Sequence, residues 1–453
     1  MPANLKIVVD DGDVNRLTIS PAIGGPHPEW IVVSFGVKTM SCRVRWTDAN
    51  LFDGGDIVCR LPADVQAYLK IPLDLSYPYR WDGKTLTIGP TIGLLFGRNA
   101  GNYTSEFMEK HYADRMLAYP EFGGLVVAYS INAVDWTTQT VTGLYYHPVK
   151  KRWVACRTTL PKVTYRRHIG QPNIKAFREA VVRSGGIMFN TARFSKWEMH
   201  RIVGDNPILR QYIPPTIRVK NADRLYQFLK QHGSVIIKPV FSSRGKGIAT
   251  LRRLDDGIRI IEYSVERRVG RLVEPEKLGE WLEAAYGRAR RKPIAQKLIP
   301  IATVGGAVFD IRVVMQRNVR GEWASSGIEC RVAATNKEIS NLAAGGRAAA
   351  IEDAFRRMDA PVGDVAKLQE EIAYFCRQFC FWMDQLEGHR FVEYGIDLAV
   401  DRNGKLWFIE ANFRPGYQGF RTFDEAAFRR ISAQPLRYAA AVQGFAVTSP
   451  DQD

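Results

Sequence analysis

The sequence predicts a mixed α/β (α+β) protein divided into several domains, and three observations support this fold class. At 453 residues, the chain is longer than one ordinary domain. Short β-rich segments separated by turns occupy the first 88 residues, and strand-like and helix-like segments alternate after them. Hydrophobic residues make up 46% and charged residues 24% of the chain, which is the balance of an ordered globular protein.

Residues 1–88 are expected to form a small β-barrel or sandwich. The segments WIVVSFG, MSCRVRW, DIVCRL and KTLTIGP are rich in β-branched and aromatic residues. Turns are expected at Asp53-Gly54-Gly55 and at Asp82-Gly83. No catalytic constellation is evident in this region.

Residues 89–205 are expected to form an α/β domain. A buried strand at 91–97 is followed by a helix near 104–119 and a second strand at 123–130. The glycine-containing loop at 97–102 lacks the G-x-G-x-x-G spacing of a dinucleotide site. This order of elements indicates a βαβ unit with parallel strands.

The remainder of the chain is expected to form one large unit. A proline-containing linker at 206–219 leads to a helix at 222–232 capped by Asn221, and a strand follows at 234–240. Strands and helices then alternate. The predicted domains are therefore 1–88, 89–205 and 206–440, the last with lobes at about 206–300 and 301–440, followed by a tail at 441–453.

The positive charge of the chain is unevenly distributed. The net charge is +16, and residues 150–220 hold 16 Lys and Arg residues against three acidic ones. Such a segment attracts phosphorylated ligands, acidic substrates, nucleic acid or membrane surfaces, and a solvated basic face is the alternative. The amino terminus lacks the apolar core of a signal peptide, and no segment approaches 18 apolar residues. A cytoplasmic location without a membrane span is therefore expected.

The stretch VIIKPVFSSRGKGIATL, residues 235–251, suggests a phosphate-binding hairpin. One strand ends at Lys238, a glycine-rich loop follows, and a second strand returns. Glycines let backbone N–H groups approach an anion, and Lys246 adds positive charge. The loop is not a Walker A motif, because the spacing differs and a strand follows it. The alternative is a flexible basic turn.

Three further segments contain groups suited to ligand binding. In FDIRVVMQRN, Asp310 and Arg312 share one face of a strand, and the Arg312 guanidinium suits phosphate or carboxylate, although an ion pair with Asp310 is equally open. In ISNLAAGG, Asn341 and two glycines could cradle an anion. The extended segment PIAQKLIPI, 293–301, could present backbone groups to a base edge or could simply be a core strand.

The stretch FVEYGIDLAVDRNGKLWFIEANFRPG predicts a hairpin with a metal site. With Asn403-Gly404 as a two-residue turn, Arg402 pairs with Lys405 and Asp397 lies opposite Glu410. Two carboxylates roughly 5 Å apart repel by about 3 kcal/mol, so a proton or cation between them is needed. Asp397, Glu410 and Asn412 offer three oxygen ligands for Mg²⁺. The alternative is that a carboxylate pairs with Arg312 or Arg414.

These segments together resemble the ATP-grasp superfamily, and most closely its YheC/YheD-like branch, named for endospore coat-associated proteins. The most specific parts of the resemblance are FDIRVV, SGIECRVA, ISNLAAGG and YGIDLAVDRNGKLWFIEAN, and residues 1–88 match least. The resemblance implies an ATP-grasp fold preceded by an α/β pre-ATP-grasp domain and a small β-rich amino-terminal domain. Where many relatives have a G-S-x-G-K-G loop, this chain has SSRGKG.

The resemblance also implies roles for individual residues. Lys238 would bind the α/β phosphates of ATP, and Lys246 would close over the phosphates in a mobile lid. Arg312 would face the γ-phosphate and the acyl phosphate. The remaining implied positions are Ser243, Gly245 and Gly247 in the lid, Gln296, Lys297, Leu298 and Ile299 as the adenine hinge, Asn341 for phosphate or substrate, and Asp397, Glu410 and Asn412 for Mg²⁺.

Three functions follow as hypotheses. The first is an ATP- and Mg²⁺-dependent carboxylate–amine ligase, a peptide or amino-acid ligase that forms a C–N bond through an acyl phosphate and takes a carboxylate substrate and an amine acceptor. The second is a non-catalytic ATP-binding structural or assembly protein of a spore-coat type. The third is a nucleic-acid-binding module that uses the basic segment, which has charge in its favour but no recognised motif.

Overall fold

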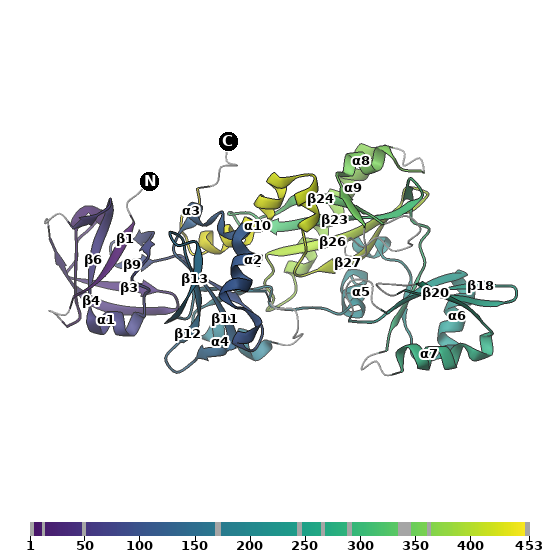
Figure 1. Cartoon of the computed structure of the whole chain (residues 1–453), viewed down its shortest axis with the longest axis horizontal. Helices are drawn as coiled ribbons and strands as arrows, with labels where there is room; N and C mark the ends of the chain where they lie inside the picture. Colours follow the sequence, from purple (N-terminus) through teal and green to yellow (C-terminus); the bar gives the residue numbers. More distant parts are fainter. Residues whose placement is uncertain are drawn as a thin grey trace.

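The computed structural model describes residues 4–10, 14–47, 51–167, 174–241, 247–263, 268–287, 292–333, 346–359 and 364–448. Over these residues the strands form four sheets that follow one another along the chain. Figure 1 shows the four regions in a row along the longest axis, with the fourth sheet lying between the second and the third. The mixed α/β class predicted from the sequence is confirmed.

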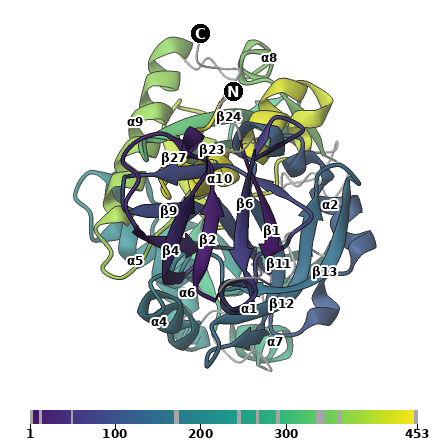
Figure 2. The same ribbon diagram turned by 90° about the vertical axis from the view of Figure 1, so that its left-hand side faces the viewer.

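The first sheet holds nine strands in the order β7-β1-β6-β2-β4-β3-β9-β8, with β5 paired to β6, and it faces the viewer in Figure 2. The expected β-rich segments coincide with β3, β4, β6 and β9. The elements are β1 (Leu5–Asp10), β2 (Arg16–Ile19), β3 (Trp30–Phe35), β4 (Lys38–Trp46), β5 (Phe52–Asp53), β6 (Asp56–Pro62), α1 (Ala63–Leu69), β7 (Ser76–Tyr77), β8 (Tyr79–Trp81) and β9 (Thr85–Ile88).

The second sheet confirms the βαβ prediction. Strand β10 pairs in parallel with β11 and β14, and β14 pairs in parallel with β15. The side chain of Thr104 caps α2, which explains where that helix begins. The elements are β10 (Thr91–Leu95), α2 (Ser105–Met116), α3 (Tyr119–Phe122), β11 (Leu125–Asp135), β12 (Thr140–His147), β13 (Arg152–Thr159), β14 (Val163–Arg166), α4 (Lys175–Arg183) and β15 (Ile187–Phe189).

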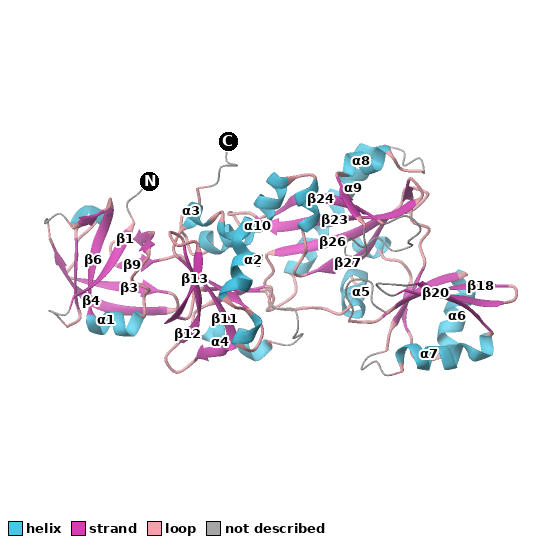
Figure 3. Ribbon diagram, viewed as in Figure 1, coloured by secondary structure: helices cyan, strands magenta, loops and turns pink. Residues whose placement is uncertain are grey.

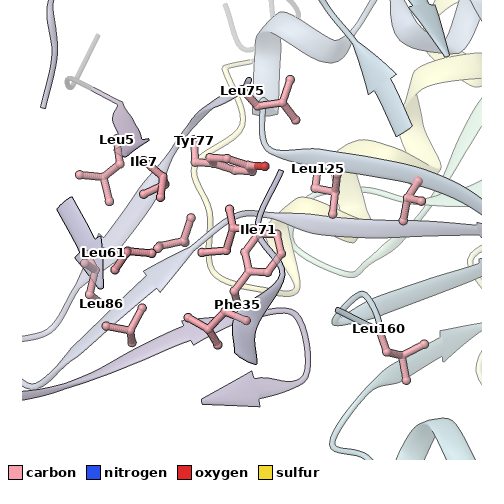
Figure 4. Close-up of a cluster of buried hydrophobic side chains, with 14 of the residues drawn as sticks. Leu5, Ile7, Phe35, Leu61, Ile71, Leu75, Tyr77, Leu86, Leu125 and Leu160 are labelled. Atoms are coloured by element: carbon pink, nitrogen blue, oxygen red, sulfur yellow. The ribbon is translucent and has the colours of Figure 1, made fainter. Parts of the chain in front are cut away.

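The apolar core of the first sheet continues into the second. Leu5, Ile7 and Tyr77 belong to the same buried cluster as Leu125 and Leu160, and Figure 4 shows these side chains together. This shared cluster fixes the two sheets against each other, because separating them would expose apolar surface to water.

The third sheet has the order β16-β21-β17-β18-β19-β20. Its helix α6 has the predicted bounds, and the side chain of Asn221 accepts a hydrogen bond from the Arg224 N–H at its start. The predicted linker at 206–219 instead contains a short 3-10 helix and strand β16. The elements are β16 (Thr216–Arg218), α6 (Ala222–His232), β17 (Ser234–Lys238), β18 (Ile248–Leu254), β19 (Gly257–Tyr263), β20 (Arg268–Val273), α7 (Leu278–Tyr286) and β21 (Ile294–Lys297).

The fourth sheet has the order β25-β24-β23-β26-β27, with β22 paired to β23, and helices pack against it (Figure 3). Helix α10 also packs on the second sheet, where Leu436 and Ala439 join a cluster with Ile92 and Leu94. The elements are α5 (Lys196–Gly204), β22 (Thr303–Val304), β23 (Ala307–Arg317), β24 (Trp323–Val332), β25 (Arg347–Ala349), α8 (Ile351–Arg356), α9 (Val365–Asp384), β26 (Glu393–Val400), β27 (Leu406–Asn412) and α10 (Glu425–Ala441).

Among the helices of the described residues, none combines the length and apolarity needed to cross a membrane.

Candidate active site

A row of four charged residues crosses the fourth sheet. Glu329 on β24 is the register partner of Arg312 on β23, which is the partner of Asp397 on β26. Asp397 is in turn the partner of Glu410 on β27. Partners in adjacent strands face the same side of a sheet, so the four side chains lie in one row. Their charges run negative, positive, negative, negative, which places two carboxylates side by side at one end. The predicted position of Asp397 opposite Glu410 is confirmed.

The hairpin that creates this pairing differs from the predicted one. Val400 pairs with Leu406, so the connection holds the five residues 401–405 rather than Asn403-Gly404 alone, and Arg402 does not pair with Lys405. The carboxylate of Asp401 accepts hydrogen bonds from the N–H groups of Asn403 and Lys405, which widens the turn. A bulge between Asp397 and Leu398 shifts the register back, which restores the partnership of Asp397 with Glu410.

Asp397 is held by two arginines. Arg312 donates from Nε to Oδ1 and from Nη2 to Oδ2 of Asp397, each at 2.8 Å, and Arg331 lies 3.0 Å from Oδ2. Asp310 pairs with Arg331 rather than with Arg312, because Arg331 is its cross-strand partner. The sequence left open that one of the carboxylates pairs with Arg312, and the structure contains this ion pair at Asp397. Asp397 is only 3% exposed.

Glu329 is a buried carboxylate at the end of the row. It is 1% exposed, and neither of its side-chain oxygens has a hydrogen-bond partner among the described residues. Burial raises the pKa of Glu329 to about 7, although the charges of Arg312 and Arg331 act to lower it. Gly419 packs so closely on this carboxylate that a Cβ there would come within 2.1 Å of Oε2. Sequence reasoning did not identify Glu329.

Glu410 is bound by a lysine from a distant segment. Lys196, the first residue of α5, donates from Nζ to Oε2 of Glu410 at 2.5 Å. Burial acts to raise the pKa of Glu410, but the charges of Lys196, Lys238 and Arg312 outweigh it and lower the pKa to about 2. The Asn412 amide lies 3.3 Å from both Glu410 Oε1 and Asp397 Oδ2, and so links the two carboxylates.

Lys238 stands at the end of β17, facing the fourth sheet. Its Nζ donates to Oε1 of Gln296 at 2.8 Å, and Gln296 donates to the hydroxyl of Thr216. Burial, together with the charge of Lys196, lowers the pKa of Lys238 to about 8. The side chain of Gln296 therefore orients Lys238, a role that the sequence prediction, which assigned Gln296 to an adenine hinge, did not include.

The predicted hinge already uses part of its hydrogen-bonding capacity. The N–H of Lys297 donates to the carbonyl of Pro215, and the N–H of Leu298 donates to the carbonyl of Ser234. The carbonyl of Ile299 accepts from the N–H of Ile301. The N–H groups of Lys297 and Leu298 are therefore already used within the fold.

One cavity brings several of the predicted residues together. Lys238, Gln296, Glu410 and Asn412 line it, while Arg312 and Asp397 are not among its lining residues. Gly247 follows the glycine-rich loop with φ +70°, and its carbonyl accepts a hydrogen bond from the hydroxyl of Tyr286. The predicted residues Ser243, Gly245, Lys246 and Asn341 lie outside the described residues.

The cavity also contains basic residues to which the sequence analysis gave no ligand-binding role. Arg166, Arg193 and Lys196 line it and belong to the basic segment 150–220, and Arg414, considered from the sequence only as an ion-pair partner of a carboxylate, lines it too. Two signals were available: the charge of that segment, and the S-x-x-E capping box at Ser195 that starts α5 with Lys196. Part of the positive charge of the segment thus lines this cavity.

Within the described residues, no group of three or more His, Cys, Asp or Glu side chains is arranged to hold a metal ion. The predicted magnesium set has two carboxylates and an amide, so it falls below that number. Glu410 and Asn412 face the cavity, and both of their side chains offer oxygen, the ligand atom that Mg²⁺ prefers.

Residues 185–442 match the family described as YheC/D like ATP-grasp. The chain is 24% identical to the endospore coat-associated protein YheD of Bacillus subtilis, over 99% of this chain and 98% of that protein. It is 21% identical to YheC of the same organism, over 70% and 88% of the two chains. Among solved structures, D-alanyl-alanine synthetase A of Vibrio cholerae is 14% identical, over 78% of this chain and 99% of that one, with a TM-score of 0.44.

Proposed function

Because the chain belongs to the YheC/D-like ATP-grasp family, we propose that it is an ATP- and Mg²⁺-dependent carboxylate–amine ligase, acting on amino acids or peptides through an acyl phosphate. One observation supports this most strongly. A single cavity joins two lysines, Lys196 and Lys238, to Glu410 and Asn412, directly beside the Arg312–Asp397 pair. This is the combination of charges that phosphoryl transfer needs.

The lysines are the residues that would bind the phosphates of ATP. Lys196 and Lys238 converge on Glu410 from α5 and β17, which are far apart in the sequence. The cost of burying Lys238 beside another cation is visible in its lowered pKa, and a bound phosphate would offset that cost. Lys246 and the rest of its loop would add a lid over the phosphates, and Asn341 would contact phosphate or substrate.

The residues present fit a magnesium ion. Glu410 and Asn412 would hold it from the cavity wall, and Asp397 would join them once Arg312 turns from Asp397 toward the transferring phosphate. The ion would supply neutralisation of phosphate charge. The Asn412 amide, which bridges both carboxylates, keeps the three groups within reach of one another.

The reaction balances without a protein nucleophile. A carboxylate oxygen of the acid attacks the γ-phosphorus of ATP, the bond to the β-phosphate oxygen breaks, and ADP leaves with that electron pair. The nitrogen of the amine then attacks the acyl carbon and loses a proton, and inorganic phosphate leaves. Arg312 stabilises the negative charge of both steps, and the lysines hold the phosphates in line.

A second function has one observation in its favour. Both curated relatives are named endospore coat-associated proteins, so a non-catalytic ATP-binding assembly protein with a spore location is the alternative. This alternative predicts nucleotide binding without turnover.

In either case we propose that the four sheets mark domains near 1–88, 89–205 and 206–440, the last in two lobes.

A trapping experiment separates the two functions. The purified chain is incubated with Mg·ATP, pooled amino acids and short peptides, and hydroxylamine, and hydroxamates and ADP are measured by mass spectrometry. We expect hydroxamate with the native chain and none with Glu410→Gln. The matched control is Glu387→Gln, an exposed glutamate of the same region that lies outside the cavity lining. Bound ATP without ADP or hydroxamate would favour the assembly protein.

A further inference from the structure

The charge of the cavity lining exceeds what a nucleotide site requires. Arg166, Arg193 and Arg414 line the cavity together with the two lysines, and Glu410 is its one acidic lining residue among those described. Five cations therefore face one carboxylate. The lysines and the magnesium ion of the proposed function already serve the phosphates of ATP, which leaves the three arginines without a role in nucleotide binding.

The cations fall into two groups. Lys196 donates a hydrogen bond to Glu410, and the charge of Lys238 also acts on Glu410, which places these three residues together. Arg166 and Arg193 form the second group, because the charge of Arg193 acts on Arg166. Arg414 donates from Nη1 to the backbone carbonyl of Arg167 at 2.6 Å, so it lies beside the same strand end.

The fold brings the arginines to a place where ligands commonly bind. Arg166 is the last residue of β14, and Arg193 follows β15, the parallel neighbour of β14. Both therefore lie at the carboxyl ends of parallel strands, the edge at which open α/β sheets bind ligands. Arg414 follows β27 by two residues and reaches the same strand end through its hydrogen bond to the carbonyl of Arg167.

Burial differs among the three arginines. Arg166 is 5% exposed, whereas Arg193 is half-buried and Arg414 is exposed. Burial together with the charge of Arg193 lowers the pKa of Arg166 to about 10. A planar guanidinium suits carboxylate and phosphate groups, so three arginines gathered on one cavity favour an anionic ligand there.

We propose that the acid substrate carries a second anionic group, a carboxylate or a phosphate, which Arg166 and Arg193 bind while the reacting carboxylate faces Lys238 and Glu410. This inference rests on the proposed function and narrows it to dianionic acids. Arg414 closes the same side of the cavity. Neutral amino acids and simple monocarboxylates lack the second group and bind more weakly.

The test is a binding measurement with matched pairs of acids. The full chain is saturated with Mg²⁺ and a non-hydrolysable ATP analogue, and acids are titrated by calorimetry. The pairs are succinate and succinamate, glutamate and glutamine, and 3-phosphoglycerate and glycerate. In at least one pair, we expect the dianionic member to bind about tenfold tighter or more, the usual effect of a charge-assisted hydrogen bond. The phosphate pair distinguishes a phosphoryl group from a second carboxylate.

Variants show whether the arginines cause the preference. Arg193→Gln is expected to remove it and leave the affinity for the ATP analogue unchanged, and Arg193→Lys is expected to retain part of it. Arg183→Gln is the control, since Arg183 is an exposed arginine of the same basic segment outside the cavity lining. Melting curves of each variant verify that it is folded.

Two results would overturn the inference: no pair shows the preference, or the preference survives Arg193→Gln unchanged. Failure of the proposed function looks different, because the ATP analogue itself then does not bind. In that case the pairs are titrated without nucleotide, and a preference that Arg193→Gln abolishes still supports the anion site.

Discussion

The first and the fourth sheets of this chain have very different interiors. Between residues 4 and 88, the buried polar residues among those described are Ser20 and Lys38. The fourth sheet buries Asp310, Glu329, Arg331, Glu393 and Asp397. Buried ion pairs seldom stabilise a fold more than apolar residues of the same size would. The buried charges of the fourth sheet are therefore best explained by the chemistry of the cavity beside them. The interior of the first sheet is explained by apolar packing alone.

The largest expected effect comes from removing the same kind of charge in both sheets. Asp397→Asn leaves Arg312 and Arg331 without their shared carboxylate, and we expect a loss of about 3 kcal/mol in the free energy of unfolding. Asp53→Asn breaks the exposed pair with Lys6 and should cost less than about 1 kcal/mol. Urea unfolding followed by tryptophan fluorescence measures both. Equal losses would remove the contrast between the two sheets.

The next effect concerns the geometry of Arg312. Arg312→Lys keeps the positive charge but loses the two-pronged contact with Asp397, so we expect the rate of hydroxamate formation to fall about 100-fold. Arg320→Lys, at an exposed arginine, is the control and should leave the rate unchanged. A rate for Arg312→Lys within about twofold of the native chain would show that Arg312 only holds Asp397 in place.

A smaller effect is the pH dependence of nucleotide binding. The pKa of Lys238 is about 8 in the free protein, and phosphate charge would raise it, so binding takes up a proton above pH 8. The affinity for Mg·ATP analogue should fall by up to about tenfold per pH unit there. Calorimetry at pH 8.5 in two buffers of different ionisation enthalpy counts the protons. Lys238→Arg should bind without proton uptake, whereas Lys230→Arg, at an exposed lysine, should behave as the native chain does.

The smallest effect is the acid stability contributed by Glu410. Its pKa is lowered to about 2, so its stabilising contribution is complete above about pH 4.5 and is lost as the pH falls toward 2. Because a third of the side chain is exposed, we expect only about 1 kcal/mol. The difference in urea midpoint between the native chain and Glu410→Gln should be smaller at pH 3 than at pH 5. A constant difference at both pH values would contradict this origin.

Local signals predicted much of the fold. The helix after Asn221 has the predicted bounds, because a capping side chain and an amphipathic pattern fix both ends. The pairing of Asp397 with Glu410 was right although the turn was wrong, since the bulge after Asp397 offsets the wider turn set by Asp401. This compensation depends on the hydrogen bonds of the Asp401 side chain, and pairing residues outward from a predicted turn does not take such bonds into account.

The parts of the site that the sequence did not predict come from long-range contacts. Lys196 meets Glu410 across 214 positions, and Arg331 reaches Asp397 from a strand two places away in the sheet. Charge counting indicated that residues 150–220 matter but not which of their side chains face inward. The pairing of Asp310 with Arg331 rather than Arg312 has the same cause, since cross-strand partners lie closer than residues two apart in one strand.

The most direct test of an ATP-grasp site between Lys238 and Glu410 is a calorimetric titration of the ATP analogue with and without Mg²⁺. The native chain should bind the analogue, and Mg²⁺ should tighten binding at least about tenfold. Glu410→Gln should still bind the analogue but lose that tightening. If the analogue does not bind, or if Mg²⁺ has the same effect on the native chain and on Glu410→Gln, the cavity is not the magnesium–nucleotide site proposed for it.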